Sequence, residues 1–400
     1  MLTRPGGRPE WIWACAGGGA LVVLGLLPLG DAVAAIAAGA DVYLFLAGMM
    51  VLAELARREG VFEWLAQHAV VAARGSGVRL FALVYAVGVA VTTLLSNDAT
   101  AIVLTPAVAA SVRRAGAAPL AYLYVCAFVA NAASFVLPIS NPANLVVFST
   151  GTPRLNLWLA AFALPSLCAI TLTYVALFAL CGNSLRGSIA SGGTPSRLNR
   201  SGRTTMWGLA LAAAVLMIAS ALGWRIGAST FVVSALLFGI VAMSDRRAIP
   251  DVCRSVSWGV VLLVAGLFVL IRGLDGTGSI DLVRHAVATA AGWPGGEGPA
   301  ALAIVVAFAT NLTNNLPAGV FAASSLGHIA SGSPLREATA IGIDLGPNLS
   351  VGGSLATVLW LAALRREGIE ADGWAFFRMG VVVMPTALVA ALAALLLTAR

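Results

Sequence analysis

Long apolar stretches follow one another along almost the whole chain, separated by short polar or glycine-rich segments. Several approach 20 residues, the length of α-helix that crosses about 30 Å of hydrocarbon. The pattern predicts an all-α polytopic membrane protein. Its apolar segments are expected at 11–29, 41–56, 80–95, 99–112, 119–150, 156–181, 206–222, 226–243, 256–271, 299–312, 316–330, 335–364 and 375–397.

Composition excludes a soluble protein. Of the 400 residues, 60% are hydrophobic and only 10% are charged, whereas soluble domains carry about 25% charged residues. The formal charge is +7, and all 24 basic residues are arginine. These arginines lie at the ends of apolar segments, as cytoplasmic loops of membrane proteins require, so we expect contact with a lipid bilayer and not with nucleic acid. The five cysteines form no CxxC pair, which leaves a disulfide framework or a metal site unsupported.

The sequence indicates two related halves. Its longest polar stretch, 183–205, is rich in glycine, serine, threonine and arginine and predicts a cytoplasmic linker between a first repeat, 1–182, and a second repeat, 206–400. Three landmarks recur in the same order, which indicates an internal repeat. They pair FLAGMMVLAELARREGVFEWL (45–65) with LLVAGLFVLIRGLDGTGSIDL (262–282), SNDATAIVLTP (96–106) with TNNLPAGVFAA (313–323), and LPISNPANLVVF (137–148) with LGPNLSVGGSLATVLW (345–360).

Arginine positions give the expected orientation. Arg4 and Arg8 place the N-terminus in the cytoplasm, and counting segments between the later basic pairs places the C-terminus outside. The second repeat is then inverted relative to the first, as in many secondary transporters. Three arginines fall on the outer side against this rule: Arg272, Arg284 and Arg336. Within the third segment, Glu54 is expected to pair with Arg58 at helical spacing.

Each repeat is predicted to contain a re-entrant hairpin and a broken transmembrane helix. The hairpins are expected at about 80–112 and 299–330, although each arm could instead span the membrane fully. The broken helices are expected at about 119–150 and 335–364. Helices in hydrocarbon are interrupted only where protein or water satisfies the freed backbone groups. The interruptions are therefore candidate sites.

The hairpin tips carry the first two interruptions. Ser96, Asn97, Asp98 and Thr100 stand in one apolar run, and Asn314 and Asn315 stand at the corresponding place in the second half. An ionisable group inside a membrane is by default functional, so Asp98 is a candidate proton carrier. The alternative is that these residues only cap helices in a turn exposed to water.

The broken helices carry the other two interruptions. Pro138 and Pro142 interrupt the first, and Pro347 with several glycines interrupts the second. A single proline kink is the alternative for each. Half-helix ends that face one another form the midplane sites of secondary transporters. The candidate substrate-binding residues of all four interruptions are Ser96, Asn97, Thr100, Asn141, Asn144, Asn314, Asn315, Asn348, Gly352, Gly353 and Ser354, and the candidate proton-coupling residues are Asp98 and Asp344.

The chemistry of these candidates favours a neutral or cationic solute. They are amides, hydroxyls and two carboxylic acids, and no basic residue stands in any interruption. Carboxyl groups that bind and release protons would support exchange of the solute for protons. No phosphate-binding loop or nucleophile motif is present, and the chain has no lysine. The sequence thus predicts a secondary transporter, not an enzyme, with no cofactor.

Four stretches resemble the arsenite/antimonite efflux permease (ArsB-type) family: SNDATAIVLTPAV (96–108), TNNLPAGVFAAS (313–324), IGIDLGPNLSVGGSLATVLWLAAL (341–364) and WAFFRMG (374–380). The resemblance covers nearly the whole chain in order. It implies two inverted repeats, and export of neutral arsenite or antimonite across the plasma (inner) membrane in exchange for protons. It also implies, in some members, a separate cytosolic ATPase subunit. The site residues implied are Asn97, Asp98, Asn314, Asn315, Asp344 and Ser354.

Two positions depart from or widen this resemblance. The family often has lysine after DLGP, where this chain has Asn348, and Ser140-Asn141-Pro142 is similar to anion and dicarboxylate relatives. The alternative function is therefore a sodium/proton antiporter or a dicarboxylate/anion transporter of the same superfamily. Two acids in the interruptions speak against the dicarboxylate version, because like charges repel.

Overall fold

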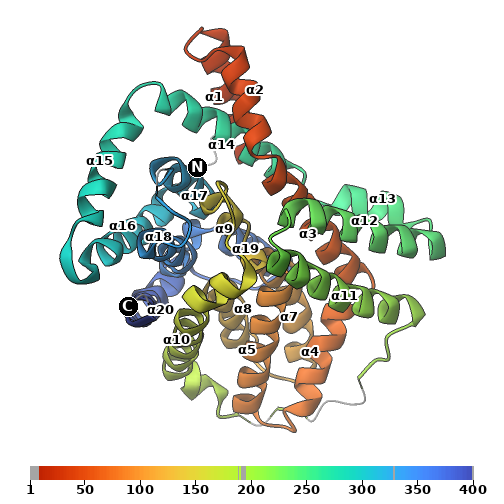
Figure 1. Cartoon of the computed structure of the whole chain (residues 1–400). Helices are drawn as coiled ribbons and strands as arrows, with labels where there is room; N and C mark the ends of the chain where they lie inside the picture. Colours follow the sequence, from red (N-terminus) through yellow and green to blue (C-terminus); the bar gives the residue numbers. More distant parts are fainter. Residues whose placement is uncertain (1–8, 188, 191–194, 328, 399–400) are drawn as a thin grey trace.

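The computed structural model describes residues 9–187, 189–190, 195–327 and 329–398, which form helices joined by short turns (Figure 1). Arg4 and Arg8, on which the predicted cytoplasmic N-terminus depends, lie outside the described residues. The elements of the first half are α1 (Glu10–Val23), α2 (Leu29–Ala38), α3 (Ala40–Arg58), α4 (Val61–Ala72), α5 (Gly77–Leu94), α6 (Asn97–Ala99), the π-turn η2 (Thr100–Leu104), α7 (Thr105–Arg114), α8 (Leu120–Ala132), η3 (Pro138–Ser140), α9 (Pro142–Val147), α10 (Leu155–Cys181) and η4 (Gly182–Leu185).

The second half follows the linker. Its elements are α11 (Arg200–Leu222), α12 (Ile226–Ser244), α13 (Ala248–Ser255), α14 (Gly259–Asp275), α15 (Ser279–Ala291), η5 (Pro294–Gly296), α16 (Glu297–Thr313), α17 (Asn315–Ser325), α18 (Pro334–Leu345), η6 (Gly346–Leu349), η7 (Val351–Gly353), α19 (Leu355–Arg366) and α20 (Gly373–Thr398).

Length and hydropathy confirm a multi-pass membrane protein. In the described part, six helices are long and apolar enough to cross a bilayer: α5, α10, α11, α12, the α13–α14 segment and α20. The pair α2–α3, bent by 47° at its junction, would be a seventh. The predicted first span, 11–29, is wrong at its C-terminal end, because α1 stops at Val23 and α2 begins after Pro28. Gly25, at φ +71°, makes the turn between these two helices.

The same order of elements occurs twice, which confirms a fold of two repeats, each with a hairpin and a broken helix. In the first half, α3 and α4 precede the hairpin of α5 to α7, the broken helix α8–α9 and the long helix α10. In the second half, α14 and α15 precede the hairpin α16–α17, the broken helix α18–α19 and α20. The helices α4 and α15 have no counterpart among the predicted segments, because charged and polar residues interrupt their apolar character.

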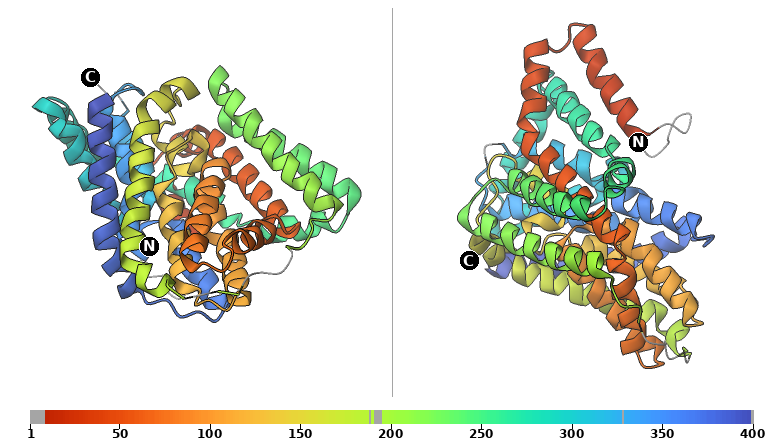
Figure 2. Two further views of the ribbon diagram at one scale, coloured as in Figure 1. Left: turned by 90° about the horizontal axis from the view of Figure 1, so that it is seen from below. Right: turned by 90° about the vertical axis from the view of Figure 1, so that its right-hand side faces the viewer.

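Each hairpin packs against the broken helix of the other half. The turn η2 contacts α19, and α17 contacts α9, so these elements meet near the middle of the molecule (Figure 1). The long helices α10 and α20 run side by side over much of their length (Figure 2). On the other side, α3 packs against α12, and α14 packs against α1. The hairpins and broken helices of both halves thus form one closely packed unit.

The arm α17 is too short to span a membrane. Its 11 residues rise about 16 Å, roughly half of the hydrocarbon thickness. The arm α7 has 10 residues, preceded by the π-turn η2 and one turn of helix. Of the two predicted interpretations of the second hairpin, the lengths therefore favour the re-entrant one.

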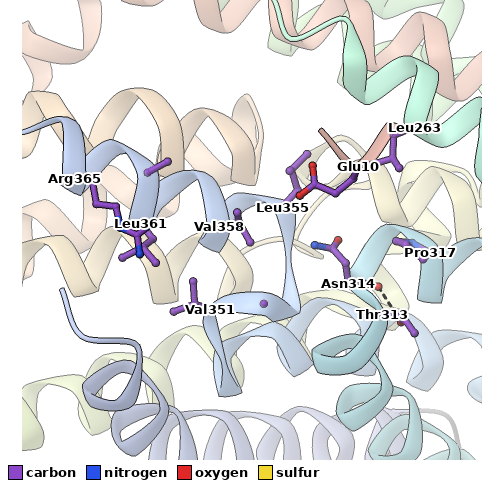
Figure 3. A pocket seen from close by; sticks show the side chains of 12 residues that line it. Glu10, Leu263, Thr313, Asn314, Pro317, Val351, Leu355, Val358, Leu361 and Arg365 are labelled. Carbon is purple, nitrogen blue, oxygen red and sulfur yellow. Dashed lines mark hydrogen bonds between the residues drawn. The ribbon is translucent and has the colours of Figure 1, made fainter. Parts of the chain in front are cut away.

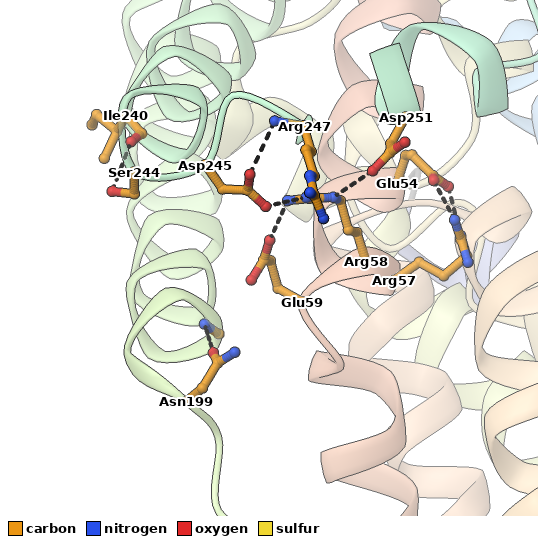
Figure 4. Close-up of polar contacts among 11 residues, drawn as sticks. Glu54, Arg57, Arg58, Glu59, Asn199, Ile240, Ser244, Asp245, Arg247 and Asp251 are labelled. Carbon is orange, nitrogen blue, oxygen red and sulfur yellow. Dashed lines mark hydrogen bonds and ion pairs between the residues drawn. The ribbon is translucent and has the colours of Figure 1, made fainter. Parts of the chain in front are cut away.

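Arginine pairs stand at the C-terminal ends of α3, α7 and α19 and just after α12, and we call these helix ends together the basic end. Arg58 forms ion pairs with Glu59, Asp245 and Asp251, which ties α3 to the turn between α12 and α13 (Figure 4). The hydrogen bond from Arg58 lowers the pKa of Asp245 below its usual value. Glu54 pairs with Arg57 instead of the predicted Arg58. The prediction failed because the Arg58 side chain turns toward the acids of another helix.

Candidate functional site

The tip of the first hairpin is a buried helix start. Ser96 caps α6 by accepting a hydrogen bond from Ala99 N at 3.1 Å. Asn97 Oδ1 accepts from Asp98 N at 2.9 Å, and Asn97 is only 2% exposed. Thr100 Oγ1 lies 2.8 Å from Thr92 Oγ1 on the opposite arm. The predicted capping role is therefore present, but in the protein interior and not in a turn exposed to water.

The tip of the second hairpin holds a strained backbone. Asn314 has φ +78° and ψ 155°, a region that residues with a side chain rarely occupy. Its Oδ1 caps α17 weakly, accepting from Leu316 N at 3.4 Å. The next residue, Asn315, is 3% exposed. Among the described residues, Asn315 Oδ1 has no hydrogen-bond partner. The strained backbone and the unpaired amide oxygen both lower stability, so this tip is a candidate functional site.

Replacing Asn314 with glycine is expected to stabilise the fold by about 1 kcal/mol, because glycine adopts positive φ without the steric cost. The measurement is thermal unfolding of the purified protein in detergent. Ser96→Gly, at the corresponding place in the first hairpin, is the matched control. Its backbone is extended with φ −173°, so it gains nothing and loses its cap. An equal shift in both variants would show that strain at Asn314 is not the cause.

Proline and glycine explain the two helix breaks. In the first, α8 stops at Ala132, and α9 begins at Pro142 after its N-cap Asn141. In the second, α18 stops at Leu345, and α19 begins after its N-cap Ser354. A side chain at Gly353 would place its Cβ 2.5 Å from Pro347 Cα. The close approach of η6 and η7 in this break therefore requires glycine at 353.

A buried hydrogen-bond network joins the breaks of the two halves. Asn141 Nδ2 donates to Asp344 Oδ1 at 2.5 Å. Asn131 Nδ2 donates to Asn348 Oδ1 at 3.0 Å, and Ser354 Oγ donates to Asn131 Oδ1 at 3.3 Å. Asp344 is fully buried, and its second oxygen, Oδ2, has no hydrogen-bond partner in the part of the chain that the structure describes. An unpaired carboxyl oxygen in the interior is costly, so it is a candidate for function.

Two cavities lie beside this network. The larger, of about 370 Å³, runs along α19 from the second hairpin tip at Asn314 to Arg365 at the basic end (Figure 3). The smaller, of about 80 Å³, lies beside the first hairpin tip and is lined by Ser96 and Asp98. Leu355, the first residue of α19, lines both cavities. The start of α19 therefore forms a wall between them.

The predicted candidates fall into three environments. Asn314 and Gly352 line the larger cavity, and Ser96 and Asp98 line the smaller one. Asn97, Thr100 and Asn315 are buried in the hairpin tips, and Asn144 donates to Ser134 O at 2.8 Å. The remaining candidates belong to the second break and to the network: Asn141, Asp344, Asn348, Gly353 and Ser354. Their roles in binding and proton coupling stay predictions.

Two asparagines that the sequence analysis did not select as site residues make hydrogen bonds at the breaks. Asn131 joins the network described above, and Asn311 donates to Gly346 O at 3.0 Å while accepting from Ser350 Oγ at 2.7 Å. Both are amides inside apolar helices, a costly placement that could have pointed to them. They were not selected because neither stands at a hairpin tip or within a helix break: Asn131 lies inside α8 and Asn311 lies inside α16.

Comparison with known proteins places the chain in a family. Residues 1–343 match the citrate transporter family (CitMHS). The chain belongs to this family. It is similar to the arsenical pump membrane protein of Escherichia coli, with 28% identity over 364 residues, which cover 87% of this chain and 84% of the relative. It is also similar to an uncharacterised transporter of Mycobacterium tuberculosis, with 28% identity over 379 residues, covering 90% and 86%.

The fold of this member of the citrate transporter family is also similar to a solved structure. The YdaH transporter of Alcanivorax borkumensis superposes with a TM-score of 0.58, covering 97% of each chain at 16% identity. At this identity the likeness concerns the fold alone. The family match and the arsenical pump relatives confirm the resemblance given by the sequence motifs and support a transporter.

Proposed function

We propose that the protein exports arsenite and antimonite, as neutral trihydroxides, in exchange for protons across the plasma (inner) membrane. One observation carries the proposal beyond the family. The residues of the four interruptions offer amides, hydroxyls and two acids but no arginine, lysine or histidine. Such a lining can hydrogen-bond three hydroxyl groups and offers nothing to neutralise an anion. The similarity to arsenical pump membrane proteins supports the same substrate.

Charge argues against citrate as the substrate of this member. A tricarboxylate at the hairpin tips would approach Asp98 and Asp344 without a counter-charge, and like charges in a buried site repel strongly. Among the described residues that line the larger cavity, the one arginine is Arg365, which stands 10 residues beyond Leu355 on α19. That spacing is about 15 Å along a helix. It is too far to bind an anion held at the tips.

The positive-inside rule supports an orientation for this exchange. We infer that the basic end faces the cytoplasm, with the N-terminus inside, the C-terminus outside and the two repeats (1–182 and 206–400, joined by the linker 183–205) inverted. In this orientation the cavity along α19 leads from the cytoplasm to Asn314. A solute that enters this cavity from the cytoplasm would come into contact with Asn314 at the second hairpin tip.

We assign proton coupling to Asp98 and Asp344. Asp98 lines the smaller cavity, and its carboxylate has no hydrogen-bond partner among the described residues. Asp344 lies in the network with one oxygen unpaired. Both acids can therefore change charge without breaking an ion pair. Exchange of protons for solute needs such a group within reach of the substrate path.

Transport by the whole protein tests the proposal. Expressed in an arsenite-sensitive host, the chain is expected to confer resistance to arsenite and antimonite. Everted membrane vesicles with an imposed acidic interior are expected to accumulate arsenite without ATP, and Asp98→Asn is expected to lower the accumulation. Uptake of citrate without arsenite would contradict the substrate assignment. Uptake that depends on a sodium gradient instead of a pH gradient would contradict proton coupling.

A further inference from the structure

The two broken helices are joined through residues that occupy equivalent places in the two repeats. Asn141 is the N-cap of α9, and Ser354 is the N-cap of α19. Asn131 stands one residue before the end of α8, as Asp344 does in α18. Both equivalences have the same spacing of 213 residues, from 131 to 344 and from 141 to 354.

Each N-cap residue donates a hydrogen bond to a residue near the C-terminal end of the first half-helix, α8 or α18, in the other repeat. Asn141 Nδ2 donates to Asp344 Oδ1 at 2.5 Å, and Ser354 Oγ donates to Asn131 Oδ1 at 3.3 Å. The two contacts are thus related by the repeat. They differ in their acceptor, which is a carboxyl group in one contact and an amide in the other.

We propose that Asn131 is a positioning residue that holds the start of α19 through Ser354 and Asn348, and that an amide is required there because it must donate and accept at once. Asn131 is 1% exposed and lines neither cavity. It acts on both cavities through Leu355, the wall residue that directly follows Ser354. The inference rests on the proposed function only in treating these cavities as the transport path.

The partners of Asn131 explain the need for an amide. The Asn131 Nδ2 group donates a hydrogen bond to Asn348 Oδ1 at 3.0 Å. The Asn348 Nδ2 group already donates to Phe128 O at 3.2 Å, so Asn348 presents its acceptor oxygen to Asn131. A carboxylate can only accept hydrogen bonds, so an ionised acid at 131 would set two acceptor oxygens against each other. A protonated acid would restore the donor. The equivalent Asp344 has no such constraint, because its Oδ2 has no partner among the described residues.

Cysteine labelling tests this inference independently of the substrate. Val358, one turn into α19, lines the larger cavity. In full-length protein with the five native cysteines replaced by alanine, Val358→Cys reacts with a membrane-impermeant maleimide in everted vesicles. Rates are compared with and without Asn131→Asp at each pH, which cancels the titration of the thiol itself. We expect equal rates at low pH and about tenfold faster labelling of the Asn131→Asp variant at high pH, the factor that loss of one buried hydrogen bond produces.

A ratio that does not change with pH would overturn the inference, because a merely structural defect would loosen α19 equally at every pH. If the aspartate variant fails to reach the membrane, Asn131→Ser decides. Serine cannot supply both bonds over the same reach, so faster labelling at all pH values is expected, and an unchanged rate overturns the inference. Arsenite uptake by the unsubstituted protein is measured separately. Its absence would remove the proposed substrate and leave the labelling result standing.

Discussion

Replacing Asp344 with asparagine is expected to reduce proton-driven arsenite uptake by about 100-fold or more, a loss typical of a group whose ionisation the reaction requires. The substitution keeps the size of the side chain and keeps an oxygen that can accept from Asn141 Nδ2, so the network at the breaks remains. It removes only the ability to bind and release a proton. The measurement is arsenite accumulation in everted vesicles under an imposed pH gradient.

Exchange of labelled arsenite separates coupling from folding. Asp344→Asn is expected to retain exchange of internal for external arsenite without a pH gradient, because substrate binding does not need the proton. Glu337→Gln is the matched control: it is a buried acid on the same helix, 9% exposed and two turns earlier, and it lines neither cavity described above. Its uptake is expected to stay near that of the unsubstituted protein. Equal losses in both variants, or loss of exchange, would remove Asp344 from proton coupling.

Replacing Arg336 with methionine is expected to destabilise the fold by about 3–5 kcal/mol, because four acceptor oxygens lose their donor at a cost of about 1 kcal/mol each. The Arg336 guanidinium donates to Val147 O at 3.0 Å and Thr150 Oγ1 at 2.9 Å through Nη1. Through Nη2 it donates to Leu326 O at 2.6 Å and Ile329 O at 2.8 Å. These acceptors lie at and just beyond the C-terminal ends of α9 and α17. Methionine fills the space but leaves them without donors.

The loss is measured as thermal unfolding of the purified protein in detergent. Arg113→Met is the control, because the Arg113 side chain is 43% exposed and its ion pair with Glu367 is long, at 3.9 Å. Exposed pairs of this kind contribute about 0–1 kcal/mol. Comparable shifts of the unfolding temperature in the two variants would show that the hydrogen bonds from Arg336 to the ends of α9 and α17 do not stabilise the fold as expected.

The position of Arg336 also explains why counting arginines along the sequence was imperfect. Arg336 stood against the positive-inside rule at the start of the second broken helix. In the fold it is fully buried and binds carbonyl groups of two helix ends. A buried arginine of this kind stabilises packing and carries no information about topology. Arg272 and Arg284 likewise pair with acids, Asp31 and Asp275 among them.

The sequence by itself determined the helical class, the multiple spans, the repeat and the positions of the four interruptions. Those properties are local: apolar run length sets a span, and proline, glycine and capping residues set where a helix stops. Ser96, Asn141, Asn314 and Ser354 all cap helices at the interruptions where the pattern places them.

Only the tertiary structure decided which interruptions meet. Asn141 bonds to Asp344 across 203 residues of chain, and Ser354 bonds to Asn131 across 223. No periodicity encodes such pairings, because they follow from how the halves pack: each hairpin lies on the broken helix of the other half. The same packing made Asn131 a partner of two predicted residues and turned Arg58 away from Glu54. Side-chain partners between distant helices depend on the relative placement of whole helices, which no local pattern specifies.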